Sequence, residues 1–134
     1  MKKLEMLRPL ALLLLRWGTG VIFIYHGYPK LAHSQQWTQS FSHMGFPSYF
    51  AYIAGVLEAL GGILLIIGLF TRISGLLLAV EMAVALWRVH LPQGSILNLG
   101  NYQLPLLLAV AAFTLAAVGG GGISLDYAIF RNKA

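Results

Sequence analysis

Long apolar stretches separated by short polar segments dominate the hydrophobic pattern of this chain. A membrane-spanning helix needs roughly 20 apolar residues, and the third of the four stretches is somewhat shorter than this. None of them carries the polar stripe that a helix of a soluble bundle would show. The pattern therefore predicts an all-α integral membrane protein, one antiparallel four-helix bundle over 1–134, with spans at about 9–28, 51–70, 73–89 and 104–123.

The segment between the first two spans has a weaker helical periodicity of its own. Trp37, Phe41 and Met44 recur at spacings of four and three residues among polar side chains. Apolar residues at this spacing share one face of a helix. We therefore expect a short interfacial helix at about 34–44, between helices 1 and 2. An aromatic anchor in the membrane interface is the simpler interpretation of this helix, and a moving lid is the alternative.

The composition supports a membrane protein and excludes several other classes. Charged residues make up 10% of the 134 positions, and the mean hydropathy is +0.76. Soluble domains carry about a quarter charged residues, so this chain could not cover a water-facing surface. A soluble enzyme and a nucleic-acid-binding protein are excluded, despite the net charge of +5. The chain has no cysteine, which excludes disulfides, thiol redox chemistry and cysteine-rich zinc sites.

The basic residues predict the orientation, because Lys and Arg concentrate in cytoplasmic segments. Given the four spans, two basic residues, Lys30 and Arg88, belong to one side of the membrane. The other side holds Lys2, Lys3, Arg8, Arg72, Arg131 and Lys133. We therefore expect a multi-pass protein of the cell (inner or plasma) membrane with both termini in the cytoplasm.

Four ionisable residues interrupt the spans and are the first candidates for function. Each charge at the bilayer centre costs roughly 2.5–3.5 kcal/mol, so we expect these side chains to face the bundle interior and to pair. Helical rise places the two acids at similar depths below the outer ends of their spans, roughly 12 and 14 Å. We predict one polar cluster of Arg16, Glu58, Glu81 and Arg88. The alternative is that buried ion pairs merely fix helix register.

Small residues flank the two acids and would leave room for a pocket that opens outward or into the outer leaflet. We expect the rim of this pocket at His26, Trp37, His90 and Tyr102. An apolar tail with a polar head, such as a quinone, suits such a site better than a hydrated ion or sugar. The opposite outcome is that the glycines bring the helices into direct contact and no cavity forms.

Histidines gather on the predicted outer side and raise the question of a metal or haem site. No two of the four are three or four residues apart, and the chain lacks a haem-attachment motif. We therefore predict no metal site. His26 and His90 are instead candidates for hydrogen bonds to a quinone carbonyl or for proton relay, because histidine titrates near neutral pH.

Short motifs spread over most of the chain resemble the DoxX family of small four-span membrane proteins. In order, they are Gly-Tyr-Pro-Lys-Leu at 27–31, Met-Gly-Phe-Pro at 44–47, Glu58 with Gly61 and Gly62, Gly-Leu-Phe-Thr-Arg at 68–72, His90, Tyr102 and Ser-Leu-Asp at 124–126. Two positions depart from the family pattern: Gln103 stands where an acid is expected, and the run Gly119 to Gly122 replaces Gly-Pro-Gly. The first departure removes a proton-active group from the fourth span.

The resemblance implies a four-helix membrane bundle associated with quinone-linked oxidoreductases and redox-stress complexes. The leading hypothesis is an accessory or quinone-interacting subunit of a membrane redox complex, with other subunits or further copies of itself as partners. The rival is a small-solute or proton-conducting carrier in which Glu58 and Glu81 titrate. A third hypothesis is a stand-alone enzyme that binds a quinone between its helices, so whether the chain is an enzyme stays open here.

Overall fold

A computed structural model describes residues 1–87 and 103–130 of the chain, and this part is helical throughout, with turns and short connections between the helices. The all-α architecture predicted from the sequence is confirmed. In chain order the helices are α1 (Lys2–Glu5), α2 (Arg8–Ala32), α3 (Ser34–His43), α4 (Phe50–Ile67), α5 (Thr71–Ala85), α7 (Gln103–Val118) and α8 (Leu125–Phe130).

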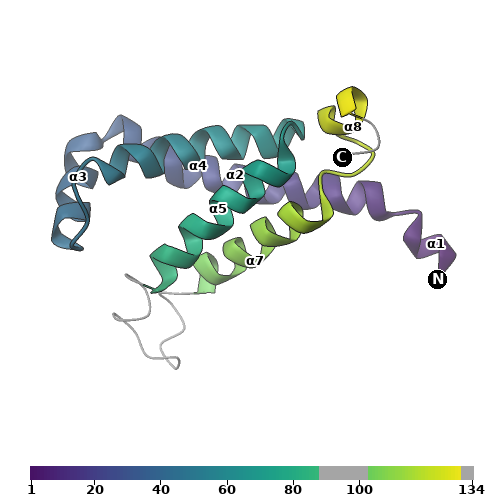
Figure 1. Ribbon diagram of the computed structural model, residues 1–134, viewed down its shortest axis with the longest axis horizontal. Helices are drawn as coiled ribbons and strands as arrows, with labels where there is room; N and C mark the ends of the chain where they lie inside the picture. The colour runs from purple at the N-terminus through teal and green to yellow at the C-terminus, as the bar shows by residue number, and fades with distance from the viewer. Residues whose placement is uncertain (88–102, 131–134) are drawn as a thin grey trace.

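The four long helices pack as two antiparallel pairs. Helix α2 packs mainly against α4 and helix α5 mainly against α7, whereas contacts between the pairs are fewer. The second pair crosses the first at an angle (Figure 1). Helix α3 lies at one end of the molecule, and α8 lies at the other, beside the turn from α4 to α5 (Figure 1). The two ends are called here the α3 end and the α8 end.

Glycines set the separation and the register of α2 and α4. A Cβ atom added to Gly20 would lie 2.6 Å from the carbonyl oxygen of Gly62, and one added to Gly62 would lie 2.6 Å from the carbonyl oxygen of Gly20. Nearer the α3 end, a Cβ atom on Gly27 would lie 2.6 Å from the amide nitrogen of Ala59. Small residues permit such backbone contact between helices in lipid. The two helices are therefore fixed at two points along their length.

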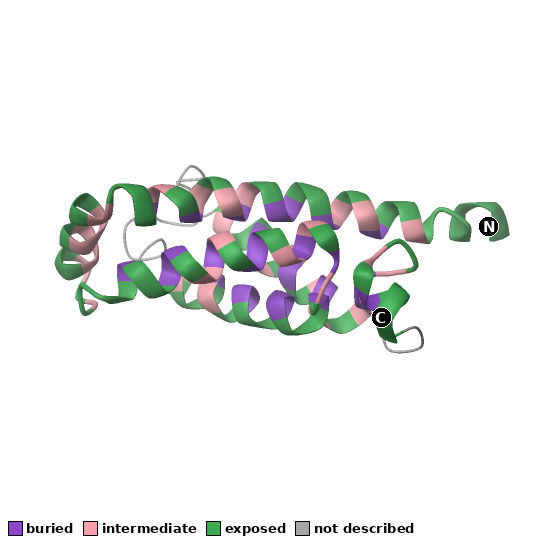
Figure 2. Ribbon diagram, turned by 90° about the horizontal axis from the view of Figure 1, so that it is seen from above, coloured by how far each residue is buried: buried purple, intermediate pink, exposed green. Residues whose placement is uncertain are grey.

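Apolar side chains lie on the outside of the bundle as well as in its core. Phe23, Leu65 and Leu78 are fully buried in the core, while Leu14, Leu60 and Leu107 are more than half exposed. Exposed and buried positions alternate along the long helices (Figure 2). By length and composition, α2 and α4 are long and apolar enough to cross a membrane, and α5 and α7 are shorter, at 15 and 16 residues.

Two of the predicted connections differ from the observed ones. The second predicted span corresponds to α4, which ends at Ile67 because Gly68 adopts a left-handed φ of 74° and caps the helix. The turn is therefore 68–70, and Thr71 already begins α5. The predicted fourth span extends to about 123, but α7 ends at Val118 because Gly119 has a φ of 89°. Glycine adopts this conformation readily, and other residues rarely do.

The other predicted bounds lie close to the observed helices. The first helix is longer than expected at both ends, at Arg8–Ala32, and accommodates Pro29 in its last turn. The short helix expected at about 34–44 is α3, Ser34–His43. The third helix is observed to Ala85, and the rest of the predicted span beyond residue 87 lies outside the described residues.

Candidate functional site

A buried ion pair joins α2 to α4 at the α3 end of the bundle. The ammonium group of Lys30 donates to Oε1 of Glu58 at 3.0 Å and to the backbone carbonyl of His26 at 3.0 Å. The side chains of the pair are 11% and 2% exposed, so water screens this interaction little. Gly27 allows α2 and α4 to approach closely beside this pair, because a Cβ atom at Gly27 would lie 2.8 Å from Cβ of Glu58.

Helix α3 places an aromatic ring over the same ammonium group. Nζ of Lys30 lies 4.8 Å from the ring centroid of Trp37, within the range of a cation–π interaction. The ring of Trp37 meets Phe41 edge-on, with 6.4 Å between centroids. None of the residues of α3 is buried. The helix is therefore lightly packed, and its Trp37 ring contacts the bundle at Lys30.

Helix α5 brings a second carboxyl group to the ion pair. The side chain of Glu81 lies near those of Glu58 and Lys30, close enough for the charges of both to act on it. Its Oε1 atom is buried and has no hydrogen-bond partner among the described residues. An unsatisfied buried oxygen is unusual, because nearly all buried polar atoms find partners. The set of Lys30, Glu58 and Glu81 is called here the α3-end cluster.

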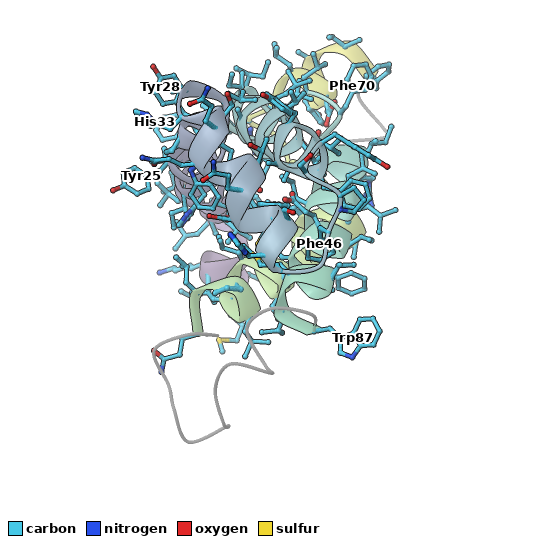
Figure 3. All side chains as sticks on the ribbon, turned by 90° about the vertical axis from the view of Figure 1, so that its left-hand side faces the viewer. Tyr25, Tyr28, His33, Phe46, Phe70 and Trp87 are labelled. Atoms are coloured by element: carbon cyan, nitrogen blue, oxygen red, sulfur yellow. The ribbon has the colours of Figure 1, made fainter. Side chains whose placement is uncertain are left out.

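His26 of α2 borders this cluster. His26 is half-buried, one helical turn before Lys30, and its ring meets that of Tyr25 edge-on at 5.7 Å between centroids. Tyr25 and Tyr28 themselves point away from the bundle, on the side where His33 also projects (Figure 3). Of the predicted rim residues, His26 and Trp37 thus lie beside the cluster, because both contact the ammonium group of Lys30.

Arg16 is buried as expected, but it lies away from the two glutamates. Its guanidinium donates to the carbonyls of Leu65 at 3.0 Å and Ile66 at 3.3 Å, and to that of Ile123. Arg16 and Lys30 share one stripe of α2, but the 14 residues between them correspond to about 21 Å of helix. The expected proximity of Arg16 to Glu58 is therefore corrected: the cation beside Glu58 is Lys30.

Three of the predicted site residues cannot be placed. Arg88, His90 and Tyr102 lie outside the described residues, so their membership of a cluster or rim stays a prediction. Among the described residues, no group of three or more His, Cys, Asp or Glu side chains could hold a metal ion.

A second polar network at the α8 end neutralises helix termini. Both carboxylate oxygens of Asp126 accept backbone N–H groups at the start of α5, from Phe70 at 2.6 Å and from Thr71 at 2.8 Å. Arg72 donates to the last carbonyls of α7, including that of Ala117 at 2.6 Å. Arg16 likewise donates to carbonyls in the last turn of α4. Charges of these signs stabilise free helix ends, so this network has a structural role.

Sequence reasoning missed the roles of Lys30 and Asp126. The predicted first span ends at about 28 and so leaves Lys30 in the outer connection, although Lys30 shares the helical stripe of Arg16, Gly20 and Gly27. Asp126 is the last residue of the Ser-Leu-Asp motif, which indicates no capping role. That stripe was the available signal for Lys30, whereas the capping of α5 by Asp126 joins positions 55 residues apart and has no local signature.

Two surface grooves lie on the described part of the chain away from the α3-end cluster, which lines neither of them. A groove of about 710 Å³ runs between α4 and α5 and is almost entirely apolar, with Leu57, Leu60 and Leu77 among its walls. A smaller groove of about 330 Å³ lies between α5 and α7. Gly61 faces Leu78 of α5, and Gly62 contacts α2, so this part of the small-residue face forms helix contacts.

These features define a small helical membrane protein with buried charge, and comparison with known proteins identifies its family. The sequence model of the DoxX family matches residues 11–91. This chain belongs to the DoxX family.

Three relatives match over nearly their whole lengths. A Bacillus subtilis protein named putative oxidoreductase CatD is 36% identical over 90% of this chain and 88% of its own. An uncharacterized Haemophilus influenzae protein is 36% identical over 98% of this chain and 99% of its own. The inner membrane protein YphA of Escherichia coli is 32% identical over 89% of this chain and 90% of its own. No solved structure matches the chain. The family and these relatives support a cell-membrane location.

Proposed function

We propose that this chain is a quinone-interacting or accessory subunit of a membrane redox complex, and that the α3-end cluster receives the polar head of the ligand. The observation that carries the proposal is the buried Oε1 atom of Glu81, which lacks a hydrogen-bond partner among the described residues beside the Lys30–Glu58 pair. A reduced quinone offers a hydroxyl donor to such an oxygen. The relative named as an oxidoreductase supports the same class of activity.

The chemistry around the cluster also fits an amphiphilic ligand. Lys30 supplies a cation, Glu81 an acceptor, and Trp37 a flat aromatic surface beside them. Ligand sites of this kind combine mostly apolar walls with a few fixed polar groups. The surrounding helix surfaces are apolar and would accommodate an isoprenoid tail in lipid.

We further propose that the chain is one membrane domain of four spans with both termini in the cytoplasm. Helices α2, α4, α5 and α7 would cross the bilayer, with the shorter pair accommodated by local thinning. The basic residues of the termini, and Arg72 in the first turn of α5, would then face the cytoplasm. In this orientation the α3 end, and with it the cluster, faces the outer side of the membrane.

Quinone binding is tested by fluorescence on the purified full chain in detergent. The probe is a short-chain benzoquinone, titrated into a variant that keeps Trp37 and carries Trp17→Phe and Trp87→Phe. We expect saturable quenching of Trp37, weakened at least tenfold in apparent affinity by Glu81→Gln. The control Glu5→Gln changes an exposed acid of α1 and should bind like the parent. Quenching that never saturates, or an apparent affinity that is unchanged in Glu81→Gln, contradicts the proposal.

Membership of a complex is tested by mild extraction of the tagged chain from native membranes. We expect a stable assembly larger than the chain alone that contains quinone in a lipid extract. Recovery of the chain without partner subunits or quinone contradicts the role as a subunit.

A proton-conducting or small-solute carrier is the second candidate, favoured by the two acidic residues, Glu58 and Glu81, that lie near each other in neighbouring helices. Intramembrane carboxyl groups commonly serve proton pathways. Liposomes that hold the purified chain should then take up protons under an imposed membrane potential, and Glu58→Leu should abolish this uptake. Liposomes that stay as tight as protein-free ones exclude proton conduction.

A further inference from the structure

Helix α1 extends beyond the α8 end of the bundle and has no packed face. None of its residues is buried, and it projects away from the four long helices (Figure 1). Backbone hydrogen bonds form its helical turns, and the N–H group of Met6 donates to the carbonyl of Lys2 at 3.2 Å. Isolated helices shorter than about 12–15 residues are marginal in water. The helical form of α1 therefore points to a surface against which it lies.

Exposed apolar and cationic side chains occur together in α1 and at the start of α2. Leu4 and Leu7 are three residues apart, which is the spacing of one helix face, and they are 62% and 51% exposed. Lys2, Lys3 and Arg8 are exposed beside them in the chain. Helices of this composition lie in a membrane interface, with apolar side chains among the acyl chains and cations at the level of the headgroups.

Helix α8 presents a second exposed apolar surface at the same end of the molecule. Tyr127 is half exposed, and the ring of Phe130 lies 6.1 Å from that of Phe70, centroid to centroid. The connection into α8 lies beside the start of α2, because a Cβ atom added to Gly122 would be 3.9 Å from Cβ of Pro9. Tyrosine is enriched at membrane interfaces. Both short helices therefore belong to one interface.

The exposed charge at the α8 end is strongly positive. Asp126 is buried there and accepts two backbone N–H groups, so its charge is already used. In the described part of the chain, four exposed cations against one exposed acid, Glu5, leave a net charge of +3 at this end; the cations are Lys2, Lys3, Arg8 and Arg72. Helix α3, at the other end, contains no Lys, Arg, Asp or Glu.

We propose that Lys2, Lys3 and Arg8 form a binding surface for anionic phospholipid headgroups, against which α1 lies with Leu4 and Leu7 among the acyl chains. The headgroup phosphates complement the cations in charge and accept their hydrogen bonds. A lipid surface fits better than free phosphate, because the exposed leucines need an apolar partner that inorganic phosphate lacks.

This inference goes beyond the proposed function, because it concerns the α8 end and requires neither quinone nor other subunits. Its test uses membranes with the same lipid mixture in both leaflets, so the result does not depend on the orientation of the chain. The lipid surface and the quinone site can therefore fail separately.

A fluorescent label on α1 of the full chain tests the proposal. Met6→Cys supplies a single thiol for a bimane label, since the natural chain has no cysteine, and Met6 is 78% exposed. The labelled chain is placed singly in nanodiscs of phosphatidylcholine, with or without phosphatidylglycerol, and quenched with neutral acrylamide. We expect the quenching constant to be at least twofold lower with phosphatidylglycerol. The difference should vanish in 1 M salt, where the Debye length is about 3 Å.

Charge variants test which residues are responsible. Each cation near an anionic surface strengthens binding about fivefold, so Lys2→Gln, Lys3→Gln and Arg8→Gln combined should abolish the effect of phosphatidylglycerol. Glu5→Gln should increase it, because this change removes the exposed acid. The matched control carries the label at Gln39→Cys in uncharged α3 and should be quenched equally in both kinds of disc. Far-UV circular dichroism checks that each variant is helical.

Four results would overturn the proposal. Equal quenching of the α1 label in both kinds of disc means that anionic lipid is not recognised there. An effect that survives in the triple variant assigns the lipid to other residues. Equal protection by inorganic phosphate in phosphatidylcholine discs identifies a free-anion site. Protection that appears only when two chains share a disc assigns the surface to a second copy.

Discussion

Nζ of Lys30 and Oε1 of Glu58 lie 3.0 Å apart and join the two longest helices of the bundle at the α3 end. Both side chains are nearly inaccessible to solvent. Breaking such a pair leaves an unpaired buried charge, whereas replacing both residues by apolar ones removes the charges together. Comparing single with double replacements therefore measures how much the pairing itself contributes to stability, separately from any role in function.

We expect Lys30→Met and Glu58→Leu each to lower the free energy of unfolding by about 3–5 kcal/mol. The double variant should recover most of this loss, because it buries no unpaired charge. Denaturant titrations in mixed micelles, followed by circular dichroism, measure the double-mutant cycle. Losses that simply add in the double variant would show that the two residues do not act as a pair.

The close approach of α2 and α4 predicts a steric effect at Gly62. A methyl group there would lie 2.6 Å from the carbonyl oxygen of Gly20, and backbone cannot move aside cheaply. Gly62→Ala should therefore destabilise the bundle by about 1–3 kcal/mol. Gly18→Ala is the matched control, because a Cβ atom at Gly18 meets nothing within 4 Å. Equal stability of the two variants in the same micelle titration would contradict the helix contact.

Asp126 should stabilise the start of α5 at a distance in sequence. Asp126→Ala removes the acceptors of the Phe70 and Thr71 N–H groups. A lost helix cap typically costs about 0.5–2 kcal/mol. Hydrogen exchange should accelerate at these two amides, and less at amides in the middle of α5. Unchanged protection of Phe70 and Thr71 would refute the capping role; Glu5→Ala, at an exposed acid, is the control.

The proposed orientation can be read from cysteine labelling, because the natural chain has no cysteine. A membrane-impermeant thiol reagent added to intact cells should label Gln39→Cys in α3 and should not label Asn132→Cys. Gln39 is exposed, so access to the reagent is not limited by packing. After the cells are permeabilised, both positions should react. Labelling of Asn132→Cys in intact cells would reverse the orientation.

Several features of this fold follow from local sequence. Apolar composition fixes α2 and α4 as helices long enough for a bilayer, and the spacing of Trp37 and Phe41 predicts α3. These features depend on neighbouring residues, which a sequence displays directly. Helix ends are also local, and the glycines at 68 and 119 carry the signal, although apolar flanking residues led the predicted spans past both.

The partner of Glu58 was decided by tertiary structure. Arg16 and Lys30 lie on the same stripe of α2, so helical periodicity presents either cation to α4 equally well. The axial register of the two helices selects between them, and it is set by backbone contacts at Gly20–Gly62 and at Gly27. That register brings Lys30 to Glu58 and Arg16 to the carbonyls that end α4. A sequence shows which face a residue occupies, but the depth at which two helices meet depends on contacts along their whole length.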